Sequence, residues 1–546
     1  MAKELKDQQD LSNAFRFSRL VIILSALAFT LFVSFIDQTS VSTALPAIAK
    51  SLDAFETISW AGTSFLVANT AFQLINGRMS DIFGRRNCLL VCMTTLAVGD
   101  LLCGFAKTPA QLYVFRGIAG IGAGGINSLV MIIFTDMTTL QQRGKYQGLL
   151  ETNIALGNGV GPLIGGAFSQ SAATWRWAFW LIVPVTAVAG VTIFLTLPKT
   201  RVEGSVVEKL GRVDYGGMLL SLAAVIFLLI PISSGGSTWS WSSPLIISFL
   251  VIGSLLGISF ILYEWKFAQY PVMPLRVFER PSAKIMFTHN FLTGIVYYSD
   301  LYFLPLYFQV VLGHSPLLSG ILILPLILGF SASSALGGVM LSRLNRCNPI
   351  IWAGYVMWTA GAGAHMAFGK DSSVGLLVGC LLVEGIGMGW AFQPVMIALL
   401  ANTRKEDRAV VTGLRNFLRT IGGAVGLAVC TATINNVLRA NLPEGVSGKS
   451  AMQLIHTLDG GKESEMVRVA YMKGVKIVFY LACPIIAVCL ISSLALTDVT
   501  LTTAYDKPAE AGVVQDKGET SVEAEEKKSV DVEDEKVPVD VEKAGR

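Results

Sequence analysis

Ionisable side chains inside apolar segments are the residues of this chain most able to do chemistry. Asp37 lies in the segment FIDQTSVSTALP, and Arg116 opens the segment RGIAGIGAGG. An ionised side chain at the centre of a bilayer costs about 2.5 kcal/mol or more, so it needs a partner. Burial disfavours an ionised carboxyl and a nearby guanidinium favours it, and this balance suits a group that exchanges a proton. We therefore predict that Asp37 and Arg116 form a proton-coupling pair; a static ion pair is the alternative.

A second set of polar residues lies in later apolar segments. Asp300 stands in VYYSDLYFLPLYFQ, which is typical of either a substrate pocket with a titratable acid or a hydrogen-bonded structural acid. The same argument applies to Glu384, with Arg419 as its candidate partner. The candidates for a substrate cavity are Asp300, Tyr298, Tyr302, Glu384, Gln393 and Arg419. Structural roles near water are expected for Asp100 and Glu151, and packing or interface roles for His289 and His365.

A loop with an unusual order of small and charged residues is NGRMSDIFGRRN, residues 76–87. Its glycines permit a close approach and a tight turn, and its aspartate and arginines can bind the ends of neighbouring helices. We predict a cytoplasmic gating loop that holds one end of a bundle together in one state. A simple excess of positive charge is the alternative. The gating residues are Gly77, Asp81, Gly84, Arg85 and Arg86.

Glycine is concentrated in the segment GNGVGPLIGG, residues 157–166. Gly157, Gly161 and Gly165 fall four apart, so they share one face of a helix. In a membrane such a face lets two helix backbones come close, while Pro162 removes a hydrogen bond and favours a bend. We predict that this face, with Gly166 beside it, packs at the seam between two halves that move. Ordinary tight packing is the alternative.

An internal repeat is indicated by two matching runs. GIGAG at 120–124 matches GIGMG at 385–389, and at the same offset of 265 residues Gly157 and Gly161 match Gly422 and Gly426. Many transporters contain such repeats, so the two runs predict a duplicated membrane protein. Leu427 replaces Pro162, which limits the expected bend to the first half.

The composition is that of a membrane protein. The chain has 546 residues, of which 53% are hydrophobic and 15% charged, whereas about 25% of a soluble domain is charged. The eight cysteines are scattered. No nucleophile–base grouping, phosphate-binding loop or metal-ligand spacing is evident. We therefore expect an all-α polytopic membrane protein without enzymatic activity, cofactor, metal or nucleic-acid partner.

Fourteen membrane spans are predicted, because about 20 apolar residues cross a bilayer. An even number puts both termini on one side, and the arginines and lysines of the short loops identify that side as the cytoplasm. The spans are 20–45, 60–79, 88–106, 111–135, 147–170, 177–197, 214–232, 245–265, 285–311, 317–341, 349–368, 374–401, 409–437 and 474–497.

The spans divide into six, two and six. Because the repeat relates the outer sets, the middle pair is interpreted as an insertion between two six-helix bundles. The tail is rich in Glu, Lys, Val and Asp and is expected to be disordered. The domains are a cytoplasmic segment 1–19, a bundle 20–198, a linker with two spans 199–283, a bundle 284–498 with an outer loop 438–473, and a cytoplasmic tail 499–546.

Together these motifs resemble the major facilitator superfamily, and more narrowly its fourteen-span drug:proton antiporters of the fungal multidrug and toxin efflux type. The gating loop matches the superfamily signature between the second and third spans, with Ile82 where an arginine is frequent. Arg116 with its glycines matches the motif of the fourth span, whose arginine is assigned to proton transfer in that family. Residues 157–166 match the antiporter motif of the fifth span.

The resemblance implies a proton-coupled secondary transporter that exports small organic molecules (a drug, a toxin or a secondary metabolite) by alternating access. The alternative is a transporter of a defined physiological substrate, such as basic amino acids into the vacuole or an iron–siderophore chelate. An acid-rich cavity with Asp37, Asp300 and Glu384 would suit cations. The expected partners are the substrate, protons and the lipid bilayer. We expect a monomer in the plasma membrane, with the vacuolar membrane as the alternative.

Overall fold

The computed structural model is helical throughout the part of the chain that it describes. It describes residues 17–497 apart from 55–56, 59, 139, 199–207, 209–210, 212, 236–238, 269–270, 315, 405–406 and 442–461. Within these residues the only strand-like pairing is an isolated bridge between Gly235 and Trp239. The expected tail 499–546 lies outside the described residues, as does most of the expected segment 1–19.

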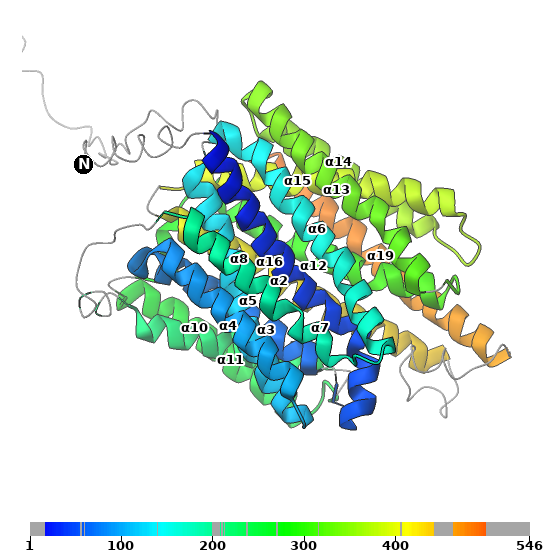
Figure 1. The fold of residues 1–546 in the computed structure, drawn as a ribbon. Helices are drawn as coiled ribbons and strands as arrows, with labels where there is room; N and C mark the ends of the chain where they lie inside the picture. Colours follow the sequence, from blue (N-terminus) through cyan, green and yellow to red (C-terminus); the bar gives the residue numbers. More distant parts are fainter. Residues whose placement is uncertain are drawn as a thin grey trace, which may run out of the picture. The chain divides into compact units, whose positions relative to one another are not determined.

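The described residues of the first half form seven helices, and every expected span of this half contains a helix (Figure 1). The sixth span is formed by two helices that meet at Leu181. Gly84, with φ of 91°, separates the second and third helices in the turn that the sequence predicts. The helices are α2 (Phe17–Leu52), α3 (Trp60–Phe83), α4 (Arg85–Phe105), α5 (Pro109–Met137), α6 (Leu140–Gln170), α7 (Arg176–Trp180) and α8 (Ile182–Thr196).

The remaining spans also coincide with helices. The two linker helices are α10 (Tyr215–Ser234) and α11 (Pro244–Lys266). The second half contains α12 (Pro281–Val310), α13 (Pro316–Leu344), α14 (Asn348–Ala364) with the short 3-10 helix η2 (His365–Ala367), α15 (Val374–Ala401), α16 (Arg408–Asn441) and α19 (Lys462–Ser493). Helices α16 and α19 extend into the expected outer loop 438–473. Ten helices of the described residues have the length and hydropathy of a membrane span.

Glycines set the closest helix contacts in both halves. On α5, a Cβ added at Gly120 would meet the Phe65 carbonyl oxygen of α3, and one at Gly122 would lie 2.5 Å from the Cys92 carbonyl oxygen of α4. On α15, Gly385 and Gly387 occupy the same places against α13 and α14. Because a side chain at these positions would enter the neighbouring backbone, glycine lets α5 and α15 lie centrally in their bundles.

The glycine face of α6 packs against α2, which belongs to the same half. A Cβ at Gly157 would lie 2.8 Å from the Phe32 carbonyl oxygen, and one at Gly161 would lie 2.9 Å from that of Ile36. In the second half, Gly422 and Gly426 of α16 face the backbone of α12 in the same way. The expectation that this face itself forms the seam is therefore wrong, because the glycines serve a contact within the bundle.

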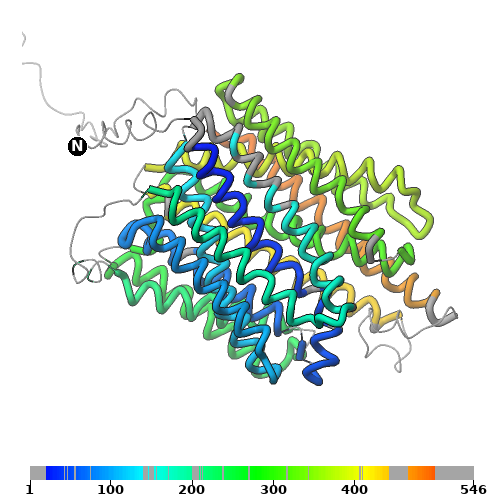
Figure 2. Tube along the Cα trace, in the orientation of Figure 1, coloured from blue at the N-terminus to red at the C-terminus, as the bar shows by residue number. Residues whose placement is uncertain are grey.

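The seam between the halves is formed by other faces of the same helices. Helix α6 packs against α13, and α16 packs against α3. Figure 2 shows the two halves as neighbouring sets of helices, blue to blue-green and green to orange. Helix α10 lies against both α3 and α16, with α11 on its outer side. Val225 and Leu229 of α10 bury apolar surface against Ala424 of α16, so the inserted pair lies at the periphery of the seam.

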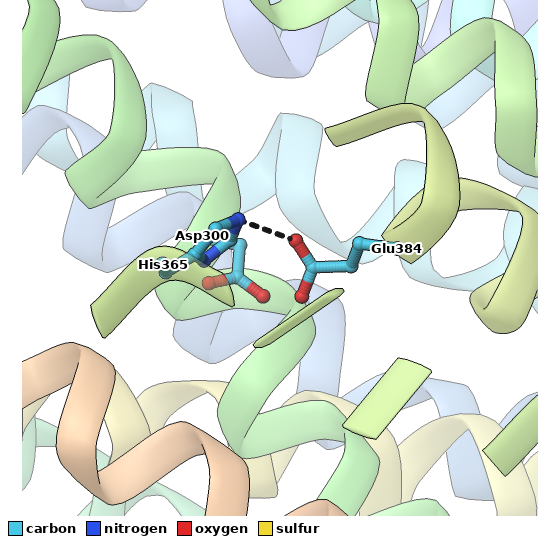
Figure 3. Close-up of side chains that lie close together, drawn as sticks. All are labelled: Asp300, His365 and Glu384. Atoms are coloured by element: carbon cyan, nitrogen blue, oxygen red, sulfur yellow. Dashed lines mark ion pairs between the residues drawn. The ribbon is translucent and has the colours of Figure 1, made fainter. Parts of the chain in front are cut away.

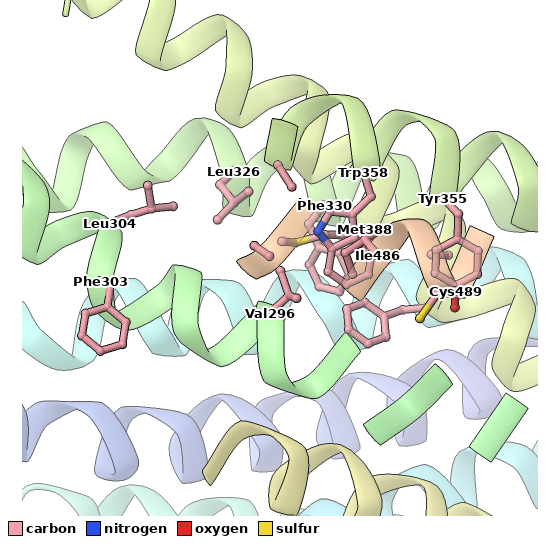
Figure 4. Close-up of a cluster of buried hydrophobic side chains, with 14 of the residues drawn as sticks. Val296, Phe303, Leu304, Leu326, Phe330, Tyr355, Trp358, Met388, Ile486 and Cys489 are labelled. Atoms are coloured by element: carbon pink, nitrogen blue, oxygen red, sulfur yellow. The ribbon is translucent and has the colours of Figure 1, made fainter. Parts of the chain in front are cut away.

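The second half has a large apolar core. Residues of α12, α13, α14, α15 and α19 meet there, and Trp358, Phe330 and Met388 lie at its centre (Figure 4). The Trp358 ring stacks on Tyr355 and contacts Phe392. Such close aromatic packing leaves little space for water. A charged group within this half is thus surrounded mainly by apolar atoms.

The contact between α6 and α2 makes a prediction for Gly161→Leu. The added side chain would overlap Thr39 and the backbone of Ile36, which should destabilise the protein by about 1–3 kcal/mol through overpacking. Thermal unfolding of the purified protein in detergent measures this effect. The matched control is Gly159→Leu on the same helix, where an added Cβ meets nothing within 4 Å. Equal unfolding temperatures for the two variants would contradict the packing argument.

Candidate functional site

The expected pair Asp37 and Arg116 is formed in the interior of the first half. Arg116 Nη1 donates to Asp37 Oδ1 over 2.7 Å, and the two side chains are 1% and 0% exposed. The guanidinium also lies 4.1 Å from the centre of the Phe65 ring. Helices α2 and α5 therefore place opposite charges in direct contact, and the aromatic ring covers the cation on one side.

Asp100 of α4 is a third member of this group. The sequence predicts a structural residue near water, but the side chain is completely buried and its Oδ1 lies 3.7 Å from Arg116 Nη1. Its carboxyl also adjoins that of Asp37. Neither oxygen of Asp100 has a hydrogen-bond partner among the described residues. The acid belongs to the buried group because α4 packs on α5 through Gly99, which contacts Ala119.

The three side chains form a cluster that one proton can neutralise. Two ionised carboxylates and one guanidinium carry a net charge of −1, and an arginine stays charged in proteins. An uncompensated charge in an apolar interior is costly, so a proton shared by Asp37 and Asp100 stabilises the cluster. One bound proton would therefore balance the charges of this cluster, Asp37–Asp100–Arg116.

A cavity lies at the seam between the halves. Its wall comes from α2, α3, α5 and α6 of the first half and α12 and α16 of the second half. The lining residues are Leu31, Phe35, Gln38, Leu66, Asn69, Gln73, Asn127, Met131, Ile154, Tyr298, Asn416, Arg419 and Thr420. Among them Arg419 alone is charged, and the other polar groups are amides and hydroxyls. The wall is therefore suited to bind an anionic or hydrogen-bonding ligand.

Two of the six expected cavity residues, Tyr298 and Arg419, line this wall. Tyr302 is 56% exposed on the outer surface of α12. Gln393 is buried and accepts a hydrogen bond of 2.9 Å from Ser334 of α13. Asp300 and Glu384 are also buried, away from the described lining. The structure thus separates the acids from the cavity, because their side chains point into the second bundle.

Glu384 pairs with a histidine instead of the expected Arg419. Its Oε2 lies 3.1 Å from His365 Nε2, whereas Arg419 faces the Phe392 ring. Asp300, His365 and Glu384 each place one ligating atom within 4.8 Å of the others. The sequence predicts a packing or interface role for His365. The 265-residue offset of the internal repeat, counted from Asp100, leads to His365, so the repeat could have identified this histidine as the counterpart of Asp100.

The gating loop connects three helix ends. Arg85 contacts Asp81 of α3 and donates through Nε to Asp136 Oδ2 of α5 over 3.0 Å. Arg86 lies over the Phe194 ring of α8 at 4.4 Å. Asp81 lies beyond the expected span 60–79, and burial raises the pKa of its carboxyl although the Arg85 guanidinium lowers it. Its ion pair with Arg85 should therefore weaken on acidification at a higher pH than that of an exposed aspartate.

Comparison with known proteins agrees with this architecture. The sequence profile described as "Major Facilitator Superfamily" matches residues 27–427. The chain belongs to the major facilitator superfamily. Its relatives include Citrate exporter 1 of Yarrowia lipolytica, 42% identical over 94% of this chain and 77% of that protein. They also include the efflux pump dotC of Dothistroma septosporum, 32% identical over 82% of this chain and 77% of that protein. The chain is therefore a membrane transporter of small molecules.

Solved structures support the fold at low identity. The human organic anion transporter MFSD10 has a TM-score of 0.55 at 15% identity, over 85% of this chain and 99% of that one. The proton:xylose symporter XylE has a TM-score of 0.56 at 14% identity, over 90% of this chain and 100% of that one. These likenesses concern the arrangement of helices.

The gating loop makes a prediction for Asp81→Asn. The neutral amide weakens the contact with Arg85, so the ends of α3, α4 and α5 should separate more often. Cysteines introduced at the two ends of the bundles should then differ from wild type in their rates of thiol labelling. Glu279→Gln, which removes an exposed acid, is the matched control. Labelling rates equal to those of this control would contradict a gating role.

Proposed function

We propose that this chain is a proton-coupled exporter of small organic molecules that works by alternating access. The observation that carries the proposal is the buried cluster Asp37–Asp100–Arg116, in which three ionisable groups are at most 1% exposed. A cluster that becomes neutral by binding one proton costs less to carry through a conformational change in a bilayer. Proton binding and rocking of the halves are thereby linked.

The packing of the halves supports alternating access. Within each half, glycine contacts bring helix backbones together, so each half can move as one body. Between the halves, Thr420 of α16 donates a hydrogen bond of 3.5 Å to Gln73 of α3 beside the cavity. The seam can therefore open on either side of the cavity while the bundles keep their internal packing.

The cavity wall favours an organic anion as substrate. Arg419 is its charged residue, and a guanidinium binds carboxylates with paired, charge-assisted hydrogen bonds. Asn69, Gln73 and Asn416 add amide groups that can bind hydroxyls and further carboxylate oxygens. The 42% identity to a protein named as a citrate exporter points the same way. Our first candidate is therefore a small hydroxylated or carboxylated metabolite.

Cationic substrates are the less favoured candidates. The acids that would attract basic amino acids, Asp37, Asp300 and Glu384, are buried within the bundles, and none is among the described lining of the cavity. A drug or toxin of neutral or anionic character remains compatible with the wall, whose other half is apolar. We place the protein in the plasma membrane with both termini in the cytoplasm, and the vacuolar membrane is the alternative.

The coupling proposal predicts the behaviour of Asp37→Asn. The amide keeps the shape of the side chain but cannot ionise. Uphill export driven by an imposed pH gradient should therefore stop. Downhill exchange of substrate should continue, because rocking no longer waits for a proton. Proteoliposomes with purified protein measure both fluxes, normalised to the amount of protein inserted.

The control for this experiment is Asp53→Asn, which changes an exposed acid just beyond the end of α2. It should retain both uphill and downhill flux. Uphill export by Asp37→Asn at the wild-type rate would remove Asp37 from the mechanism. Impaired folding and a lower amount of inserted Asp37→Asn protein would support the static ion pair instead.

The substrate proposal predicts the behaviour of Arg419→Gln. Loss of a charge-assisted hydrogen bond costs about 1.5–3 kcal/mol, so the KM for citrate-like anions should rise about tenfold or more. Arg419→Lys keeps the charge and should have a smaller effect. Radiolabelled citrate and related acids in proteoliposomes measure KM, with Arg343→Gln at an exposed site as the matched control. An unchanged KM for every acid transported by the wild type would contradict the assignment of Arg419.

A further inference from the structure

The second half contains its own buried cluster of ionisable groups, Asp300–His365–Glu384. The residues come from α12, η2 and α15, and Figure 3 shows the imidazole and both carboxyls facing one another. The exposed fractions are 3% for Asp300 and 0% for His365 and Glu384. These acids lie inside the bundle and not on the described wall of the cavity. Their role is therefore distinct from direct contact with a substrate there.

The cluster has polar atoms without partners. Asp300 Oδ2, Glu384 Oε1 and His365 Nδ1 have no hydrogen-bond partner among the described residues. The imidazole lies 4.8 Å from the ring centre of Phe368 and 5.1 Å from that of Phe479. Unshared charge in such apolar surroundings is costly. Binding of a cation that neutralises the negative charge of the two carboxylates would therefore stabilise the cluster.

Among the described residues, the titratable side chains near the cluster do not supply a positive charge that would balance its two carboxylates. Two thiols lie close to the acids of the cluster: that of Cys380 near Glu384 and that of Cys430 near Asp300. Beyond η2, Lys370 is paired with Glu465 and both are exposed. On α13, Arg343 is exposed at the far end of the helix. The net charge of the cluster therefore depends on its own protons.

The cluster lies on elements of the second half that correspond, through the internal repeat, to the helices of the first cluster. Gly99 of α4 contacts Ala119 of α5, and Gly361 of α14 contacts Glu384 of α15. Glu384 therefore stands where the first half has Ala119, three residues from Arg116. Each cluster combines two carboxyls with one group that can be cationic. An imidazole, unlike a guanidinium, loses its proton near neutral pH.

We propose that Asp300, His365 and Glu384 form a second proton-binding site, which exchanges up to two protons during transport. With both carboxylates ionised and the imidazole neutral, the charge is −2; two protons bring it to zero. The carboxyls share one proton, and the imidazole takes the other and pairs with Glu384. This inference rests on the proposed proton-coupled function and assigns the second half its own coupling site.

A proton fits this cluster better than a metal ion. A zinc ion bound by three protein ligands takes a fourth ligand, and calcium takes six to eight oxygens. The phenyl rings of Phe368 and Phe479 occupy the space beside His365. A proton needs only the atoms already present. Stoichiometric zinc binding is therefore an outcome that would overturn the proposal.

The first test detects protonation directly and needs no transport. Infrared difference spectra of the purified full-length protein, between mildly alkaline and mildly acidic pH, should contain a carboxyl C=O band. Glu384→Gln and Asp300→Asn should each remove or shift part of this band, and His365→Gln should shift its pH midpoint. Asp371→Asn, an exposed acid after η2, is the matched control. Spectra unchanged in all three cluster variants would overturn the proposal.

The second test counts protons in proteoliposomes. The number of protons exchanged per substrate, measured from the gradients at which net flux is zero, should fall by at least one in His365→Gln and Glu384→Gln. Uphill export through the first cluster should persist. A wild-type ratio in both variants would overturn the second site. A wild type without any proton dependence would instead contradict the proposed function, and the infrared band would then decide separately whether the cluster binds protons.

A third measurement separates the metal alternative. Titration of the wild type and His365→Gln with zinc, after treatment with a chelator, should show no tight binding that depends on His365. Tight binding to the wild type that is lost in His365→Gln would identify a metal site and overturn the proposal. Glutamine is close in size to both glutamate and histidine. We therefore expect Glu384→Gln and His365→Gln to fold, so that these tests report on protons and zinc and not on unfolding.

Discussion

Backbone-to-backbone contact at glycine is the constraint on which the two bundles depend. Gly120 and Gly122 of α5 admit the backbones of α3 and α4, and Gly385 and Gly387 of α15 do the same for α13 and α14. Helix association within a bilayer has no hydrophobic driving force, so close packing must supply the attraction. Each central helix is therefore enclosed by its neighbours, and residues on its inward faces are removed from lipid.

The buried charges follow from that packing. Gly99 brings α4 against α5 and carries Asp100 next to Arg116; Gly361 brings α14 against α15, and Glu384 meets His365 beyond this contact. In a medium that does not solvate ions, such groups persist only when they neutralise one another or share protons. The same geometry that stabilises each bundle thus buries two clusters of ionisable groups, which we propose as proton-binding sites. The cavity at the seam is left with Arg419 as its charged wall residue.

The division of labour between these regions is consistent with a secondary transporter. Ionisable clusters lie within the bundles, whereas Tyr298, Asn416 and the amides of α3 face the space between them. A substrate at the seam can therefore contact both halves, while the ionisable clusters are not part of the described cavity wall. In the mechanism that we propose, helix α2 links the two regions, because it carries both Asp37 and the cavity residue Gln38.

The sequence by itself determined the helical class, the pair Asp37–Arg116 and the superfamily, because these depend on hydropathy, glycine spacing and local motifs. The roles of Asp100 and His365, the separation of Glu384 from Arg419 and the partner of the glycine face on α6 depended on tertiary structure. Hydropathy indicates that a charged residue lies within a span. The neighbours of its side chain depend on the rotation of the helix about its axis. That rotation is set by packing between helices far apart in the chain, so it cannot be deduced from the spacing of residues along one helix.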